Sequence, residues 1–530
     1  MKKHLQFLIP VMLVTMYQAS MAQQPYINKN IDINNINAMI TPSSDLFWDF
    51  NNAHFEVPKG SGLHAIFAGG LWIGGLDATG NIHLAGQTYR QTGNDFWPGP
   101  IDTIGTPGPA NYLDYLETRK VNKSEIINHQ LNFSTPNYVV PYNIATWPGY
   151  DTTVQRVLAP FADYNGNGIY DPENGDYPFI LGDQSVYAVF NDWYNHTETG
   201  CSALGVEVHR EFWGFDAPSN TALNNSIFSR YQIKNYSAND YHDFYILMWT
   251  DFDLGNAVDD YIGTDIGLDM VYVYNGDSLD ETASGYGANP PAVGVYFLDQ
   301  TLSGSMVYEN VNNNPIGNPN GCFDFYNYAK TIWLDNQPVT YGADGRDITN
   351  PVTTYMYPGV TDPINYPLLG EWSEANAGNF PNDRRATAAI GPFNLNSQDV
   401  FTFDVGYTYA RATSGGPLAS VAELQNAVSG LRTMYSNGQL TATPKIPNVS
   451  AGQINVFPNP ASEVVTIKNT SPDKLFNVVI LDAVGRVVFK KDQVSNNMLN
   501  IDVRSFARGI YIVSVTQDKQ MFNQKLIIQK

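Results

Sequence analysis

The fold of this 530-residue chain is first visible in Gly509-Ile510-Tyr511-Ile512-Val513-Ser514-Val515, a run close to its end. Tyr511, Val513 and Val515 share one face of this run, because side chains alternate between the two faces of a β-strand. Six further short β-type runs are bounded mostly by Asn, Asp, Pro or Gly: Ile454–Val456, Val464–Ile467, Phe476–Leu481, Val487–Lys490, Met498–Asp502 and Gln520–Gln529. The loop Asp482-Ala483-Val484-Gly485 is typical of a hairpin turn, since Gly485 adopts positive φ without steric cost. Seven short strands in this segment predict a small antiparallel, immunoglobulin-like β-sandwich.

Four motifs of the same segment carry a family resemblance. They are Phe457-Pro458-Asn459-Pro460 at its start, Gly485-Arg486 at the turn, Gly509-Ile510-Tyr511-Ile512-Val513, and the closing Lys525-Leu526-Ile527-Ile528. Residues 454–530 resemble the type A C-terminal sorting domain of the type IX secretion system. The resemblance implies recognition by an outer-membrane translocon, removal by a sortase-like peptidase, and a cell-surface or secreted location. The alternative interpretation is an ordinary immunoglobulin-like module, such as a glycan-binding appendage.

The N-terminus independently predicts export. A basic start, Lys2-Lys3-His4, precedes the apolar core Phe7–Tyr17, which is too short to span a bilayer. Small residues at Ser20 and Ala22 fit a cleavage site after Ala22, which makes Gln23 the first residue of the mature chain. The alternative is a buried N-terminal helix. No later stretch reaches 18 uninterrupted apolar residues, so we expect no transmembrane segment in the mature chain.

Charge separates the chain into two parts. The net charge is −22, yet residues 451–530 hold 10 Lys and Arg against 6 Asp and Glu. The first 450 residues hold 19 against 45, a net −26. We therefore expect a signal peptide at 1–22, a cargo region at 23–445 of one or two packed subdomains, a linker at 446–453 and the sorting domain at 454–530. The acidic cargo argues against a nucleic-acid partner and favours cation binding, with simple solubility as the alternative.

Aromatic and glycine-rich runs predict a β-rich cargo. Gly69-Gly70-Leu71-Trp72-Ile73-Gly74-Gly75 reads as a closely packed strand whose aromatic neighbours form either a sandwich core or a sugar platform. The runs Ile227–Asn235 and Asp243–Asp251 read as an antiparallel pair. The predicted cargo fold is a mainly β, multi-strand antiparallel sandwich. The Gly69–Gly75 run, the loop at 163–176 and Gly391-Pro392-Phe393 resemble large exported proteins with the same sorting domain, a resemblance that assigns no chemistry.

One late helix is predicted in the cargo. Ser420 and Glu423 form a capping-box pattern, and apolar residues follow at helical spacing up to Met434. The pair Asn437-Gly438 then ends the helix. It follows the alternating strand Asp399–Arg411 and is expected to pack on a sheet face.

The loop at 163–176 follows the first nine positions of an EF-hand calcium loop. Its candidate oxygen ligands are Asp163, Asn165, Asn167, the Ile169 carbonyl and Asp171. Position 12 is Asn174 rather than Glu, so Glu173 or Asp176 must supply the missing carboxylate. The sequence therefore predicts a helix-free Ca²⁺ site, with an Asn/Gly turn held by side-chain hydrogen bonds as the alternative.

A second acidic cluster follows the apolar run Phe244–Trp249. Its members are Asp251, Asp253, Asp259, Asp260 and Asp265. Five carboxylates so close in sequence repel one another unless they are solvated or share a cation. The cluster is a weaker candidate for a second Ca²⁺ site, and a catalytic carboxylate pair of the glycosidase type is the other chemical interpretation.

Two cysteines, Cys201 and Cys322, lie in the exported cargo. An oxidising compartment favours a disulfide between them, and two buried free thiols are the alternative. No zinc spacing, serine elbow, phosphate loop or dinucleotide fingerprint occurs. The leading functional interpretation is therefore a calcium-stabilised surface protein for adhesion, glycan or envelope contact. The alternative is an extracellular hydrolase that acts on polysaccharide through the carboxylates of 251–265.

Overall fold

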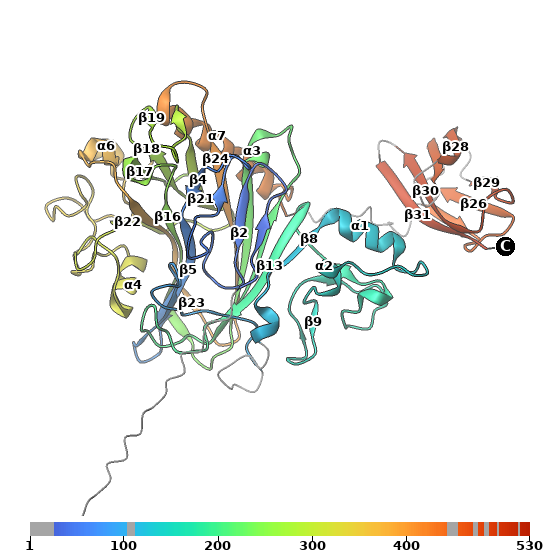
Figure 1. Ribbon diagram of the computed structural model, residues 1–530, viewed down its shortest axis with the longest axis horizontal. Coiled ribbons are helices and arrows are strands. Elements are labelled where there is room, and N and C mark those ends of the chain that lie inside the picture. Colours follow the sequence, from blue (N-terminus) through green and yellow to red (C-terminus); the bar gives the residue numbers. More distant parts are fainter. Residues whose placement is uncertain are drawn as a thin grey trace, which may run out of the picture.

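Antiparallel strand pairing organises most of the chain. The computed structural model describes residues 26–102, 112–441, 454–469, 475–481, 487–495, 498–517 and 520–529. The predicted signal peptide with Ala22 and Gln23, the linker at 446–453 and the turn Asp482–Gly485 lie outside the described residues. Figure 1 shows the fold, which is mainly β as predicted.

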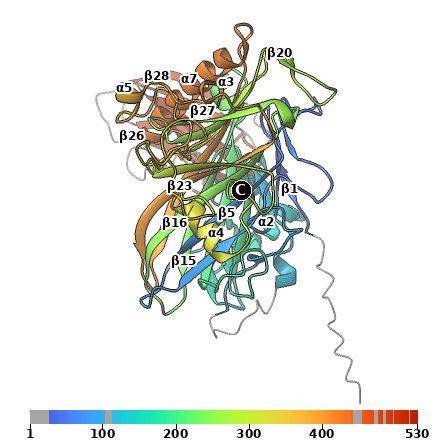
Figure 2. The same ribbon diagram turned by 90° about the vertical axis from the view of Figure 1, so that its left-hand side faces the viewer.

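The larger of two main sheets has nine strands. In order across the sheet they are β17 (Asp260–Asp265), β18 (Met270–Asn275), β21 (Ala292–Phe297), β24 (Val400–Ala410), β15 (Ser226–Asn235), β14 (Val206–Gly214), β13 (Gln184–Asn191) and β7 (Trp97–Pro98), and β8 (Arg119–Asn122) also pairs with β13. The second sheet has the order β22 (Gly304–Glu309), β23 (Arg384–Leu395), β16 (Tyr241–Phe252), β5 (Ala68–Leu76) and β6 (Ile82–Gly86). Figure 2 shows β23, β16 and β5 side by side.

Smaller sheets complete the cargo. One contains β1 (Lys29–Ile31), β2 (Asn37–Ile40), β3 (Phe55–Glu56) and β4 (His64–Ile66). The two-stranded ribbons are β9 (Tyr150–Asp151) with β10 (Arg156–Val157), β11 (Phe161–Ala162) with β12 (Tyr177–Pro178), and β19 (Leu279–Asp280) with β20 (Gly287–Ala288).

The two main sheets share one hydrophobic core. Phe212 and Tyr407 of the nine-stranded sheet belong to the same buried cluster as Met248 and Ala388 of the five-stranded sheet. Burial of aromatic and aliphatic side chains from both layers is what holds a sandwich together. The predicted antiparallel sandwich is therefore confirmed for the cargo.

The predicted antiparallel pairing of Ile227–Asn235 with Asp243–Asp251 is wrong. Both strands exist, as β15 and β16, but they lie in different sheets. β15 pairs with β14 and β24, whereas β16 pairs with β5 and β23. The chain crosses from one layer to the other between them. A hairpin and a sandwich crossing both need a polar turn, so local sequence does not separate the two.

The aromatic and glycine-rich run at 69–75 forms β5, as predicted. Trp72 is buried, and so are the aromatic side chains of Phe47 and Phe96. Gly70 lies so close to β6 and its continuation that a Cβ there would come within 2.1 Å of the Gln87 carbonyl oxygen. These aromatics are core side chains, and the sugar-platform interpretation does not apply to them.

The late helix is present as α7 (Gly416–Ser436), and its start differs from the prediction. Gly415 precedes the helix, and Ser420 lies inside it. The buried Ser420 hydroxyl donates to the Pro290 carbonyl at 2.7 Å and accepts from the Ala412 amide at 3.0 Å. Ser420 therefore fastens the helix to neighbouring loops instead of capping it.

The described part of the cargo contains other, shorter helices in addition to α7. They are α1 (Lys123–Asn132), α2 (Tyr142–Ala145), α3 (Thr221–Asn224), α4 (Cys322–Ala329), α5 (Tyr366–Leu369) and α6 (Glu374–Ala377). α1 begins with a capping box between Asn122 and Glu125, a signal that was present in the sequence.

Seven strands form the C-terminal segment, as predicted. One sheet contains β25 (Ile454–Phe457), β26 (Val464–Asn469) and β29 (Met498–Asp502), and the other contains β28 (Val487–Val494), β27 (Phe476–Leu481), β30 (Gly509–Gln517) and β31 (Gln520–Ile528). β27 pairs with β28 as the predicted hairpin. Tyr511, Val513 and Val515 are buried in a core that both sheets share with Val465 and Ile467. The segment is thus a small antiparallel sandwich.

Candidate functional site

The calcium-type loop joins β11 to β12. Within it, the Asp163 carboxylate accepts hydrogen bonds from the amides of Gly166 at 2.7 Å and Gly168 at 2.8 Å. Both glycines have positive φ, which permits the tight path of the loop. The side-chain oxygens of Asn165 and Asn167 each accept from a loop backbone amide. Asn165 Oδ1 accepts from Asn167, and Asn167 Oδ1 accepts from Ile169.

The remaining acidic residues of this loop are also hydrogen-bonded. The Asp171 carboxylate accepts from the Asn165, Asn167 and Asn174 side-chain amides at 2.8–3.2 Å. The buried Asp176 carboxylate accepts from the Tyr164 amide at 2.8 Å and the Asp171 amide at 2.9 Å, so it ties the start of the loop to its end. The arrangement is that of side-chain-stabilised turns, and Ca²⁺ binding here stays a prediction.

The second cluster is divided among several places. Asp251 belongs to the end of β16, and Asp253 follows it. Asp259 ends the short 3-10 helix Ala257–Asp259, and Asp260 begins β17. Asp265 stands at the opposite end of β17 and accepts from the Gln425 side chain of α7 at 2.8 Å. The structure therefore does not bring Asp265 together with the other four.

Asp260 is a fully buried carboxyl group. Its Oδ2 accepts from the Leu254 amide at 2.9 Å, and its Oδ1 has no hydrogen-bond partner. Burial raises the pKa of Asp260 well above its ordinary value, and the nearby Asp259, Asp253 and Asp280 carboxylates raise it further. Asp260 therefore favours its protonated form more than an exposed aspartate does.

The Asp251 carboxylate accepts hydrogen bonds from two side chains that are distant in sequence, Tyr89 and Arg385. The Tyr89 hydroxyl donates to Asp251 Oδ2 at 2.6 Å, and Arg385 Nη2 donates to the same oxygen at 3.0 Å. Arg385 also donates to the Tyr89 hydroxyl and forms an ion pair with Asp383. Burial raises the pKa of Asp251, while Arg385 opposes that rise.

Asp383, which directly precedes β23, joins this group. Asp251, Asp253 and Asp383 each place a carboxylate oxygen within 4.8 Å of the others. Among the described residues, this is the one group of three or more His, Cys, Asp or Glu side chains close enough to share a metal ion. Local sequence does not reveal Asp383 as a member of this group, because it lies 130 residues beyond Asp253 and joins the group only through strand pairing.

Cys201 and Cys322 form a disulfide, with Cα atoms 4.9 Å apart. The bond joins the β13–β14 loop to the first residue of α4. It therefore fastens a helix on the five-stranded sheet to a loop from the nine-stranded sheet.

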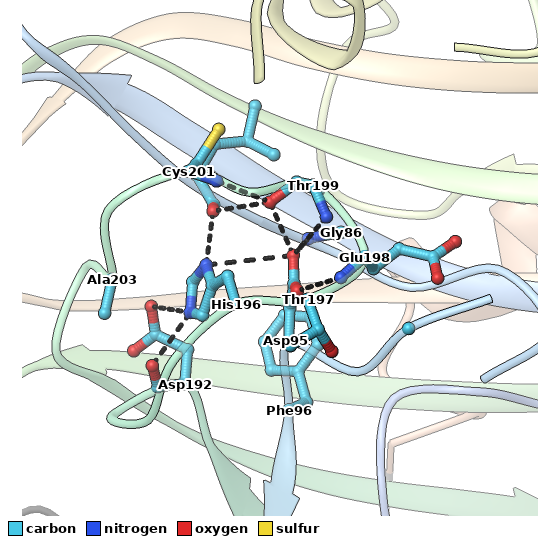
Figure 3. Close-up of polar contacts among 12 residues, drawn as sticks. Gly86, Asp95, Phe96, Asp192, His196, Thr197, Glu198, Thr199, Cys201 and Ala203 are labelled. Carbon is cyan, nitrogen blue, oxygen red and sulfur yellow. Dashed lines mark hydrogen bonds and ion pairs between the residues drawn. The ribbon is translucent and has the colours of Figure 1, made fainter. Parts of the chain in front are cut away.

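A buried polar network adjoins Cys201 (Figure 3). The Cys201 amide donates to the Thr199 hydroxyl, which donates to Asp95 at 2.6 Å. His196 lies between Asp95 and Asp192, at 3.7 and 3.5 Å, and its ring nitrogens contact the backbone carbonyls of Leu84 and Asp192. The His196, Asp95 and Asp192 side chains have no exposed surface, so the network holds the β13–β14 loop rather than meeting a substrate.

Comparison with known proteins identifies the C-terminal segment. Residues 455–529 match the family described as the secretion system C-terminal sorting domain. No curated protein sequence matches the chain. None of the helices in the described residues has the length and apolarity needed to cross a membrane.

Two solved structures show limited similarity. A DUF3244 family protein with an immunoglobulin-like β-sandwich fold from Bacteroides vulgatus is 25% identical, covers 15% of this chain and 87% of its own, and has a TM-score of 0.14. A polysaccharide lyase is 8% identical over 71% of this chain, which spans 43% of the lyase, with a TM-score of 0.20. Both scores are too low to bear on function. The family match confirms the type IX sorting domain at the C-terminus, and the chain is an exported cell-surface or secreted protein.

Proposed function

We propose that the cargo is a non-enzymatic contact protein at the cell surface or in the medium, in adhesion, glycan or envelope interaction. The observation that carries the proposal is the long segment between β22 and β23. Phe323, Leu368 and Phe380 of this segment are 75%, 81% and 87% exposed. Exposed loops that carry large apolar side chains are favoured positions for partner contacts.

The same segment contains α4, α5 and α6 and carries further exposed apolar side chains, including Ile348, Ile364 and Leu369. Its base is fixed, because the Cys201–Cys322 disulfide and the buried Trp333 and Trp372 attach it to the cargo. A partner-binding loop on a fixed base loses less conformational freedom on binding than a free loop.

Burial of three of its five carboxyl groups weighs against the alternative of a polysaccharide hydrolase that uses 251–265, whereas Asp253 and Asp259 are partly exposed. The exposed fractions of Asp251, Asp260 and Asp265 are 1%, 0% and 5%. A general acid or nucleophile must reach the glycosidic bond, and carboxyl groups so deeply covered do not.

Delivery follows from the sorting domain. The proposal includes recognition by the type IX outer-membrane translocon, followed by removal of residues 454–530 by a sortase-like peptidase. Mass analysis of the protein on the cell surface measures this step. We expect a mature C-terminus upstream of residue 454, and an intact sorting domain on all surface molecules would contradict it.

The contact role is tested with the full exported protein and its Leu368→Ser/Phe380→Ser variant. We expect at least about 10-fold weaker binding to cells or to an immobilised glycan panel, since lost apolar contacts cost roughly 1.4 kcal/mol or more in total. Val139→Ser is the matched control, because Val139 is 82% exposed in a different part of the cargo. Cleavage of a polysaccharide that is lost in Asp253→Asn would overturn the proposal in favour of the hydrolase.

We also propose that Ca²⁺ binds the loop at 163–176 and stabilises the cargo. At free Ca²⁺ about 100-fold above the dissociation constant, binding to the native state alone adds roughly 2.7 kcal/mol. A chelator is therefore expected to lower the melting temperature of the exported protein. Asp163→Ala should remove the part of this effect that belongs to the loop. Equal chelator sensitivity in Asp163→Ala and the wild type would leave the loop as an ordinary turn.

A further inference from the structure

Strand register brings two carboxylates together at one end of two interior strands of the five-stranded sheet, β16 and β23. β16 and β23 pair Asp251 with Arg385 and Phe252 with Arg384. The next position of this register sets Asp253 opposite Asp383, just beyond the ends of the two strands. Like charges directly opposite one another destabilise an antiparallel pair. Something must therefore offset the repulsion between Asp253 and Asp383.

Asp251 adds a third carboxylate with an unsatisfied oxygen. Its Oδ2 is fully engaged with Tyr89 and Arg385, as described above. Its Oδ1 is buried and has no hydrogen-bond partner. A buried carboxylate oxygen without a donor is costly, so a missing partner for Oδ1 is indicated.

The local cations do not balance these charges. Arg385 forms ion pairs with both Asp251 and Asp383. The distance from Arg385 Nη2 to Asp251 Oδ2 is 3.0 Å. Arg384 is occupied by Glu374 at 3.1 Å and Glu309 at 3.3 Å. Three ionised carboxylates with one guanidinium leave a net charge of −2, which a divalent cation neutralises.

We propose that Asp251, Asp253 and Asp383 bind one divalent cation, and that Ca²⁺ fits them best. Carboxylate oxygens within 4.8 Å of one another are compatible with a shared ion at about 2.3–2.6 Å, and an all-oxygen ligand set selects a hard cation. Asp253 and Asp383 are only partly buried, so water completes the coordination from the solvent side. Tyr89 and Arg385 are positioning residues that orient Asp251.

The three carboxylates lie close enough to repel one another, and Asp251 is almost completely buried, so a shared cation relieves both costs. The site is separate from the loop at 163–176, and it does not depend on the contact role proposed above.

Metal binding is measured on the full exported protein in an Asp163→Ala background, which removes the loop as a competing site. The probes are Ca²⁺ by calorimetry and Tb³⁺ by luminescence excited through the nearby tyrosines. We expect one site in this background, and at least about 10-fold weaker affinity after Asp253→Asn, because affinity falls with ligand charge. Asp347→Asn, which removes an exposed carboxylate elsewhere, should bind as the parent does.

Melting temperatures of the same proteins provide a second test. The proposal predicts that the difference between variant and parent changes sign between chelator and Ca²⁺. In chelator, Asp253→Asn should melt at or above its parent, because it removes a like charge from the pair with Asp383. In excess Ca²⁺ the order should reverse, because the parent gains more from the ion. Asp383→Asn should behave in the same way, although it also loses the ion pair with Arg385.

Two results would overturn the proposal. One is equal Ca²⁺ and Tb³⁺ affinity in Asp253→Asn, Asp383→Asn and their parent. The other is a melting difference between variant and parent that is the same in chelator and in Ca²⁺. Loss of the chelator effect in Asp163→Ala alone would instead assign all calcium binding to the loop.

Discussion

At the scale of single residues, close backbone approach determines which side chains are tolerated. Gly70 in β5 faces the Gln87 carbonyl, and that carbonyl accepts a 3.0 Å hydrogen bond from the Trp72 indole. The oxygen is thus held in place and has little room to move. The glycine-rich sequence signalled close packing, and the structure identifies the atom that enforces it.

Gly70→Ala is expected to destabilise the cargo by at least about 2 kcal/mol, because its methyl group would overlap the Gln87 carbonyl. Gly430→Ala is the matched control. Gly430 lies on the exposed side of α7 with no atom within 4 Å of an added Cβ. There, alanine should stabilise the protein by about 0.5–1 kcal/mol through helix propensity. Urea unfolding of both variants measures the difference, and equal effects would contradict the packing argument.

Asp280 makes stability depend on pH. It is almost completely buried, and burial raises the pKa of Asp280 to about 6. Its carboxyl group accepts from the Tyr286 and Asn256 amides, at 2.7 and 3.2 Å. The native state binds the proton of Asp280 more tightly than the unfolded state does. The resulting contribution to the free energy of unfolding is therefore complete below about pH 4. It is lost as the pH rises to about 6.

Asp280→Asn removes that titration. Between pH 4 and pH 7 the free energy of unfolding of the variant should rise relative to wild type, by up to about 3 kcal/mol. Denaturant unfolding at the two pH values measures it. A variant-to-wild-type difference that is the same at pH 4 and pH 7 would show that Asp280 does not carry the effect.

At the scale of elements, alternation and helical spacing were reliable guides. Met270 and Tyr274 of β18 pack against α7, and the intervening Val271 and Val273 enter the core between the sheets. In α7, Leu424 and its neighbours at helical spacing are buried on the outer face of the nine-stranded sheet. Such periodicity is local, so the sequence could predict that β24 and α7 exist and which of their sides are apolar.

The disulfide is an element-scale constraint that joins α4 to the β13–β14 loop. Intact-mass analysis without reductant should find the exported protein two hydrogens lighter than its dithiol form. Replacing Cys201 and Cys322 with Ser should destabilise it by up to about 4–5 kcal/mol on the loop-entropy estimate, because the bond closes a 121-residue separation. Complete alkylation of both thiols in unreduced, unfolded protein would rule the bond out.

At the scale of the whole molecule, charge and core composition both separate cargo from sorting domain. The C-terminal core contains residues only from 456 onward, and the cargo clusters contain none of them. Each part therefore has its own apolar core, which is the physical basis for an independently folding domain.

Deletion of residues 454–530 should leave the cargo folded but retained in the periplasm, because the export signal is lost and the cargo cores are intact. Cell fractionation and protease resistance of the truncated protein measure the two parts of this prediction. Normal amounts of truncated protein outside the cell would show that the segment is not required for export.

The sequence by itself determined the β class, the seven C-terminal strands, the late helix and the sorting domain. Each of these depends on patterns within a few residues or on a contiguous motif. Tertiary structure alone decided that β15 and β16 lie in different sheets, that Asp265 is remote from Asp251, and that Asp383 joins Asp251 and Asp253. These features depend on which distant strands pair and in what register. Register is set by packing of the whole core, and local sequence does not encode it.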